Sequence, residues 1–277
     1  MSSFHWNTEE MSPNQVKIAD YIQRHTREVL LSTEKEIAEA VGLSTASVSR
    51  FWKSVGYKNL KDFKKKMKEK VDITPAKKLE NMIDMIGGDM WQKEFLTLGI
   101  TYLQETIEHF NLEEFEAAVT LLHQANLIHL YCPGPTEGLA GLLQYRLNRF
   151  GFAVKPMKSS GSELLESLLT IKAGDVIVLF GFIRMLPEAR VIIDYAIQHD
   201  IKTILITDQL VSDFNGQVDI TLFASRGEVQ HFHSMIAPTF IIESLIIALG
   251  KTNEHQTFER LHKLSNLRKR YEQHLPR

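Results

Sequence analysis

The side chains of residues 44–50 combine short hydroxyl groups with one guanidinium group. These are groups that hydrogen-bond to the phosphates and base edges of DNA, and small neighbours let a helix approach the bases closely. The stretch follows a predicted helix over 34–41 and has the form of the second helix of a helix-turn-helix. The candidate contacts are Ser44, Thr45, Ser47, Ser49 and Arg50.

Local signals position this second helix. Thr33 and Glu36 have the spacing of a capping box at the start of helix 34–41, and Gly42 suits the left-handed turn that ends it. Ser44 can then cap helix 44–54, whose apolar residues fall on one face. A plain helical hairpin on the surface remains the alternative interpretation.

The segment that follows is strongly basic. Residues 50–70 contain nine lysines or arginines and two acidic residues. Phe63 and Met67 stand four residues apart and predict an anchored amphipathic helix over 59–70. Such a run is either a solvated helix face or a source of attraction for DNA phosphates. The candidate phosphate contacts are Lys53, Lys64 and Lys65.

Charge divides the chain of 277 residues into two parts. Residues 1–80 hold 15 basic and 11 acidic residues, against 17 and 23 in the remainder, so a basic head precedes an acidic body. The length favours two domains, and the single Cys132 fits a reducing compartment. Without an apolar run of about twenty residues, we expect a cytoplasmic protein with no membrane partner.

The two parts differ in their predicted elements. The head is all-helical, with helices over 13–25, 34–41, 44–54 and 59–70, and residues 71–90 read as a connection. In the body, strands that are apolar throughout alternate with helices, which predicts a parallel five-stranded sheet covered on both faces. These strands are expected over 127–131, 152–156, 175–180, 202–207 and 218–223.

Ligands of such sheets bind at the carboxyl ends of the strands. Three loops are therefore expected at one site, over 132–137, 181–187 and 207–213. Gly134 and Thr136 precede a predicted helix over 137–149 and could cradle an anion at its amino end. Alternatively, the prolines of this loop only shape a tight turn.

Both parts together resemble the RpiR family of bacterial transcription regulators. The head carries the resemblance over about 10–70, and the body over about 107–250. The matching head residues are Ile37-Ala38, Val41-Gly42-Leu43-Ser44, Ser47-Val48, Arg50-Phe51, Gly56-Tyr57 and Phe63.

The resemblance implies an all-α helix-turn-helix head joined to a sugar isomerase (SIS) domain, a flavodoxin-like α/β sandwich that senses phosphosugars. The domains would be 1–75 for DNA, 76–106 as linker and connecting helix, 107–250 for sensing and dimerisation, and 251–277 as a C-terminal helix. The expected partners are double-stranded operator DNA, a small-molecule effector for which a phosphosugar is the candidate, and further copies in a homodimer or homotetramer.

The family's ligand loops are changed here. The first loop, Gly-x-Gly-x-Ser in the family, reads Cys132 to Thr136, and the hydroxyl-rich second loop is replaced by the apolar stretch 181–187. Arg184 is a possible substitute for the lost hydroxyls, since a guanidinium group binds phosphate. A phosphosugar, another small ligand and no ligand stay open. The candidate ligand residues are Gly134, Thr136, Gly181, Arg184, Glu188, Thr207, Glu228 and His233.

Metal and enzyme chemistry are weakly signalled. His231 and His233 with Glu228 stand on a predicted loop, where their spacing favours ordinary polar groups over a metal site. A sugar-phosphate isomerase would need a positioned base, for which only Glu188 or His233 qualifies. We expect no metal, no cofactor and no enzymatic activity.

Overall fold

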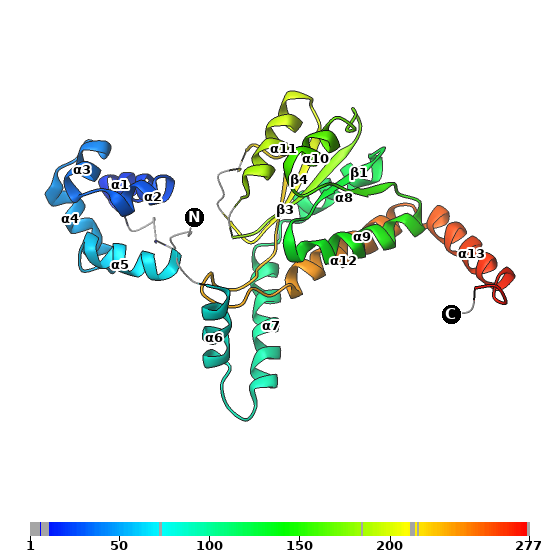
Figure 1. The fold of residues 1–277 in the computed structure, drawn as a ribbon, viewed down its shortest axis with the longest axis horizontal. Helices are drawn as coiled ribbons and strands as arrows, with labels where there is room; N and C mark the ends of the chain where they lie inside the picture. The colour runs from blue at the N-terminus through cyan, green and yellow to red at the C-terminus, as the bar shows by residue number, and fades with distance from the viewer. Residues whose placement is uncertain are drawn as a thin grey trace. The chain divides into compact units, whose positions relative to one another are not determined.

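The computed structural model describes residue 6 and residues 11–71, 74–183, 185–210, 214 and 216–275. The chain forms two compact units. One comprises Met1–Trp91 with Gly227–His233, and the other comprises Gln92–Arg226 with Ser234–Arg277. Figure 1 labels most of the helices and strands of both units.

The first unit is helical. Its helices are α1 (Pro13–Arg24), α2 (Thr26–Leu31), α3 (Glu34–Val41), α4 (Thr45–Ser54), α5 (Leu60–Val71) and α6 (Pro75–Met85). The predicted capping box of α3 is present, with Thr33 and Glu36 bonding each other's backbone N–H. Gly42 ends α3 with a left-handed φ of 65°, which turns the chain sharply into α4.

An aromatic cluster holds α4 and α5 together. The ring of Trp52 on α4 lies 4.6 Å from that of Phe63 on α5 and 5.4 Å from that of Phe51. All three side chains are fully buried. Since α4 and α5 share this core, their outer faces are held in a fixed relation.

A return of the chain completes the first unit. Thr74 caps α6 and Pro75 is its first residue, which suits proline because that position needs no N–H donor. On α6, Asn81 Nδ2 donates to the carbonyl oxygen of Gln230 at 2.9 Å. Segment 227–233 is thereby tied to α6.

The second unit is built on a parallel sheet. Its strands are β1 (Ile128–Tyr131), β2 (Val154–Pro156), β3 (Val176–Gly181), β4 (Lys202–Thr207) and β5 (Ile220–Phe223). They run in the order β2-β1-β3-β4-β5, and every neighbouring pair is parallel. This is the flavodoxin-like strand order. The predicted fold class, a helical head with a five-stranded parallel α/β body, is confirmed.

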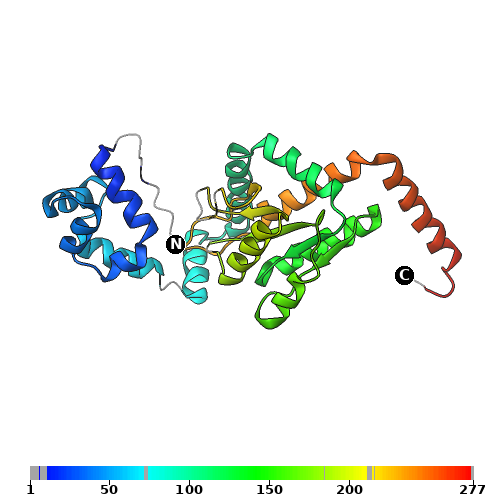
Figure 2. The same ribbon diagram turned by 90° about the horizontal axis from the view of Figure 1, so that it is seen from above.

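Helices cover both faces of the sheet. The helical elements are α7 (Trp91–Glu108), α8 (Leu112–Gln124), the 3-10 turn η2 (Gly134–Thr136), α9 (Glu137–Phe150), α10 (Gly161–Leu168), α11 (Pro187–Gln198), α12 (Ile236–Thr252) and α13 (Glu254–Arg270). Helices α8, α9 and α12 share a core with one face, and α10 and α11 with the other. In both views α13 extends past the end of α12, away from the sheet (Figures 1 and 2).

The strands are apolar on both faces because both are covered. In β3, Val176, Val178 and Phe180 belong to the core under α8, α9 and α12. Ile177 and Leu179 belong to the core under α10 and α11. This alternation explains why the strand reads as a continuous apolar run in the sequence.

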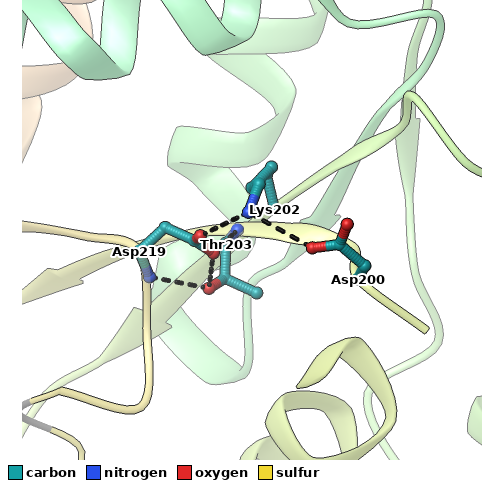
Figure 3. A network of polar contacts seen from close by, with 4 residues as sticks. All are labelled: Asp200, Lys202, Thr203 and Asp219. Atoms are coloured by element: carbon teal, nitrogen blue, oxygen red, sulfur yellow. Dashed lines mark hydrogen bonds and ion pairs between the residues drawn. The ribbon is translucent and has the colours of Figure 1, made fainter. Parts of the chain in front are cut away.

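A polar network connects β4 and β5 at the amino-terminal edge of the sheet (Figure 3). Asp219 Oδ2 accepts the N–H of Thr203 at 2.9 Å and its hydroxyl at 3.0 Å. Lys202 Nζ lies 3.1 Å from Asp219 Oδ1 and 3.3 Å from Asp200 Oδ1. The hydrogen bonds that Lys202 donates to Asp219 and Asp200 raise its pKa. The contacts of Asp219 also hold this residue, just before β5, against the first residues of β4.

The structure corrects several predicted elements. The predicted helix 13–25 corresponds to α1, but the short helix α2 that follows it was not predicted. Between the two, the chain leaves helical geometry at His25, and the Thr26 hydroxyl donates to the Ile22 carbonyl at 2.8 Å. Residues 71–90 were interpreted as a connection but contain α6. Helix α10 was not predicted and buries Leu164 and Leu168.

Candidate functional site

Helix α4 presents a distinct outer face. Its inward positions Val48, Phe51 and Trp52 are fully buried in the core of the head. Thr45, Ala46, Arg50 and Lys53 are exposed. Side chains of these types and this spacing suit a helix that enters the major groove with its first turns.

Two of the predicted contacts also shape the helix. The Ser44 hydroxyl accepts the N–H of Ser47 at 3.2 Å, and the two hydroxyl oxygens lie 2.9 Å apart. Ser47 and Ser49 are half-buried. The structure therefore gives Ser44 and Ser47 a capping role at the start of α4, whereas Thr45 is exposed.

Arg50 is held against its own helix. Its Nε donates to the carbonyl oxygen of Ala46, one turn earlier, at 3.2 Å. Both residues are exposed. Sequence analysis singled out Arg50 but missed Ala46, because a lone alanine in a helix carries no chemical signal of its own.

The lysines of α5 have different environments. Lys64 Nζ donates to the Ser32 carbonyl at 2.6 Å and so stabilises the end of α2. Lys66 Nζ lies 3.3 Å from Asp62 Oδ2 and 5.1 Å from the centre of the Tyr57 ring. Lys65 is exposed. Of the predicted phosphate contacts, Lys53 and Lys65 are exposed residues, and the ammonium group of Lys64 supports the fold.

In the second unit, the carboxyl ends of β1, β3 and β4 lie side by side. The strand order brings Gly134, Thr136, Gly181 and Thr207 to one edge of the sheet, as the sequence predicted for such loops. Glu188 stands in the first turn of α11, next to the same edge. This edge is the expected binding crevice of an open α/β sheet.

The first loop forms an internal turn. Gly134 has a left-handed φ of 63° and begins η2. The Thr136 hydroxyl is buried and donates to the Pro133 carbonyl at 2.9 Å. Burial, with a contribution from the charge of Glu137, raises the pKa of the neighbouring Cys132 thiol. The Thr136 hydroxyl is therefore bonded within the turn, and burial disfavours the thiolate form of Cys132.

The second loop is covered by its own side chains. A Cβ atom on Gly181 would lie 2.9 Å from the sulfur of Met185 and 3.0 Å from Leu205 Cδ1. The N–H of Ile183 donates to Asp208 Oδ1 at 2.8 Å. The Asp208 carboxylate thus accepts a hydrogen bond from a backbone N–H group that a bound anion would otherwise use.

A buried arginine completes this cluster. Arg226 Nη1 lies 3.9 Å from Asp208 Oδ2, and its Nε donates to the Ser234 carbonyl at 3.2 Å. Its guanidinium carbon lies 4.4 Å from the centre of the Phe182 ring. Burial lowers the pKa of Arg226, and the charge of Asp208 opposes that effect. The sequence analysis did not single out Arg226, although a charged residue three positions after an apolar strand was a usable signal.

Glu188 acts on a buried phenol. Burial and the charge of Glu188 raise the pKa of Tyr131 to about 12. The Tyr131 hydroxyl lies 3.5 Å from the Ser159 carbonyl oxygen, to which it donates. Tyr131 ends β1 and was not predicted as part of the site.

The other predicted ligand residues are Glu228, His233 and Arg184. Glu228 and His233 lie in segment 227–233, which belongs to the helical unit. There the Glu228 carboxylate accepts a hydrogen bond from the side chain of Gln230 at 2.6 Å. Arg184 lies outside the described residues.

The described residues lack two features. Over these parts of the chain, no three His, Cys, Asp or Glu side chains gather closely enough to hold a metal ion. Within the same ranges, no helix combines the length and apolar character needed to cross a bilayer.

Comparison with known proteins identifies the head and the body. Residues 3–72 match the helix-turn-helix domain of the rpiR family. The HTH-type transcriptional regulator YbbH of Bacillus subtilis is 24% identical over 256 residues, covering 87% of this chain and 87% of the relative. The NanR protein of Vibrio vulnificus, solved in complex with ManNAc-6P, shares the fold over 96% of both chains, with 20% identity and a TM-score of 0.59. The head is thus similar to the helix-turn-helix domain of the rpiR family, and the chain as a whole resembles transcription regulators of that type.

Other relatives are similar to parts of this chain. The sugar isomerase domain of an RpiR transcription factor from Sphaerobacter thermophilus covers 63% of this chain and 98% of that one, at 21% identity and a TM-score of 0.59. The bifunctional protein glk of Paraburkholderia xenovorans is 28% identical over 200 residues, which make up 71% of this chain. This chain spans only 31% of the length of that relative.

Proposed function

We propose that this chain is an RpiR-type regulator that binds operator DNA through α4 and α5 and thereby controls transcription. The observation that carries the proposal is the outer face of α4, where Thr45, Ala46, Arg50 and Lys53 are exposed beside a basic helix. Short and cationic side chains on the first turns of a recognition helix suit contacts in the major groove, and lysines alongside suit phosphates.

The test is selection of duplexes from a random library, followed by fluorescence anisotropy at several salt concentrations. We expect an enriched motif and an affinity that falls with salt, because phosphate contacts release counterions. Lys65→Ala should reduce the salt slope by about 1. The matched control is Lys77→Ala on α6, whose ammonium group lies 3.2 Å from Glu80. Failure to enrich any motif, with no salt dependence, would overturn the proposal.

We further propose that the body senses a phosphosugar or a related carbohydrate metabolite at the carboxyl edge of the sheet. The NanR protein, solved with ManNAc-6P, supports this class of effector. The site itself is atypical, since the Thr136 hydroxyl is bonded to Pro133 and the Ile183 N–H to Asp208. Loss of phosphosugar binding is therefore the alternative.

A thermal-shift titration separates the two. Phosphosugars, inorganic phosphate and the corresponding free sugars are added to the full chain. A ligand present at a concentration of 100 times its Kd should stabilise the folded protein by about 2.7 kcal/mol. Met185→Ala uncovers Gly181 and should enlarge a phosphosugar shift, while Arg184→Ala tests the arginine predicted from the sequence. A shift with free sugars only would mean a different ligand, and no shift would mean that this role is lost.

We also propose that the chain acts as a homodimer or homotetramer without enzymatic activity. Two copies would present two heads to a pseudo-palindromic operator. An isomerase needs a base within reach of its substrate, and Glu188 lies next to the buried Tyr131 phenol. Sedimentation equilibrium tests the first statement. Conversion of aldose to ketose phosphates, followed by NMR, would refute the second.

A further inference from the structure

The bond between Arg50 and Ala46 limits what α4 can read. Arg50 Nε donates to the Ala46 carbonyl at 3.2 Å, which holds the guanidinium group against the helix surface beside Ala46. The side chain is thereby drawn back toward the first turns of α4, the part of a recognition helix that contacts base edges.

The remaining donors of Arg50 form one edge. Because Nε donates to Ala46, the N–H groups of the two terminal nitrogens, Nη1 and Nη2, are the ones left for a ligand. The residue is exposed. Two parallel N–H donors fit the O6 and N7 acceptors of guanine, which no other base presents as a pair in the major groove. Because the bond to Ala46 fixes the guanidinium group beforehand, less side-chain freedom is lost on binding.

The neighbouring contact comes from Ala46. Residues four apart on a helix have Cβ atoms about 5–6 Å from each other, and Arg50 reaches back across that gap. The exposed methyl group of Ala46 therefore stands beside the base edge that Arg50 would bind. An alanine methyl group in the major groove makes its apolar contact with the C5-methyl group of thymine.

We infer that α4 reads a guanine adjacent to a thymine, with Arg50 bound to the guanine and Ala46 in contact with the thymine methyl group. The inference rests on the proposed function, since it specifies which base step the DNA-binding helix selects. Thr45 and Lys53, on the same exposed face, serve phosphates or flanking positions.

The experiment uses the full chain and duplexes selected from a random library. The selected motif is expected to contain guanine next to thymine, and replacing this guanine should weaken binding about five- to 150-fold. Arg50→Lys should abolish that preference because an ammonium group cannot form the paired contact. The matched control is Lys53→Ala, which should weaken binding to all duplexes equally.

Thymine is tested separately by substitution with uracil, which removes only the methyl group. The wild-type chain should lose about fourfold in affinity, the value for one buried methyl group. The affinity of the Ala46→Gly variant should not change when thymine is replaced by uracil. Ala46→Ser, which disturbs the helix less, serves as a second variant. Circular dichroism checks that both variants fold.

The outcomes separate the inference from the function on which it rests. If no motif is enriched, the DNA-binding proposal itself is overturned. If a motif is enriched and Arg50→Lys keeps its full preference for guanine, the assignment of Arg50 is wrong. If uracil weakens the wild-type chain and Ala46→Gly equally, the assignment of Ala46 is wrong.

Discussion

Replacing Asp208 by alanine tests the charge cluster at the carboxyl edge of the sheet. Asp208 Oδ1 accepts the Ile183 N–H at 2.8 Å, and Oδ2 lies 3.9 Å from Arg226 Nη1. The side chains of Asp208 and Arg226 are only 10% and 6% exposed. The substitution therefore leaves a guanidinium group buried without its carboxylate.

The expected cost follows from this burial. Removing one partner of a buried ion pair costs about 3–5 kcal/mol. The lower end applies here, because the pair is long and Arg226 keeps the Ser234 carbonyl and the Phe182 ring. We expect a loss of about 3 kcal/mol, which lowers the unfolding temperature by roughly 6–12 °C for a domain of about 150–250 residues.

Scanning calorimetry of the full chain measures the effect as a shift in the transition of the sheet unit. Asp208→Ala combined with Arg226→Met removes both charges and should recover much of the lost stability. Asp194→Ala, at an exposed position on α11, is the matched control and should change stability by less than about 0.5 kcal/mol. The reasoning is refuted if Asp208→Ala matches this control, or if the double variant is no more stable than the single one.

Three further predictions concern stability. Burial raises the pKa of Asp219, but bonds from Thr203 and Lys202 lower it overall, so its carboxylate stabilises the fold above about pH 4 and that contribution is lost as pH falls through the lowered pKa. Asp219→Asn should flatten the acid limb of stability measured by urea unfolding, and an unchanged limb would contradict this. Trp52→Ala empties the centre of the head and should cost about 3–5 kcal/mol, seen as an earlier unfolding transition by circular dichroism. Gly42→Ala places a side chain at a φ of 65° and should cost about 1–2 kcal/mol in the same assay; no change would mean that the turn relaxes.

The elements that sequence predicts well are those defined by neighbours in the chain. The cap at Thr33 and the turn at Gly42 depend on residues within one helical turn, and both occur as predicted. The strands follow from apolar runs, because both sheet faces are covered. Helix α10 has only two buried leucines in eight residues, which is too short a pattern to separate from a loop.

The site depends on contacts that sequence spacing does not encode. Asp208 and Arg226 follow different strands, and only the order of β4 and β5 brings them together. The type of Thr136 matched the ligand role, but the direction of its hydroxyl, toward Pro133, is set by the turn. Segment 227–233 joins α6 through Asn81, across almost 150 positions, which no local pattern signals.

The Asp208 contact also constrains the effector. A phosphate bound at the β3 loop needs backbone donors, and the Ile183 N–H is already given to a carboxylate. The phosphate must displace the Asp208 carboxylate from this N–H group and then lies close to it, and the two negative charges repel each other. Asp208→Asn removes the repulsion while keeping an acceptor, so phosphosugars should bind this variant more tightly than the wild type. A neutral sugar has no such repulsion to lose, and its affinity should stay within a factor of about two to three. Calorimetric titration of both ligand classes measures the change in affinity. Unchanged phosphosugar binding by Asp208→Asn would mean that the effector binds away from this loop, and weaker binding would refute the predicted repulsion.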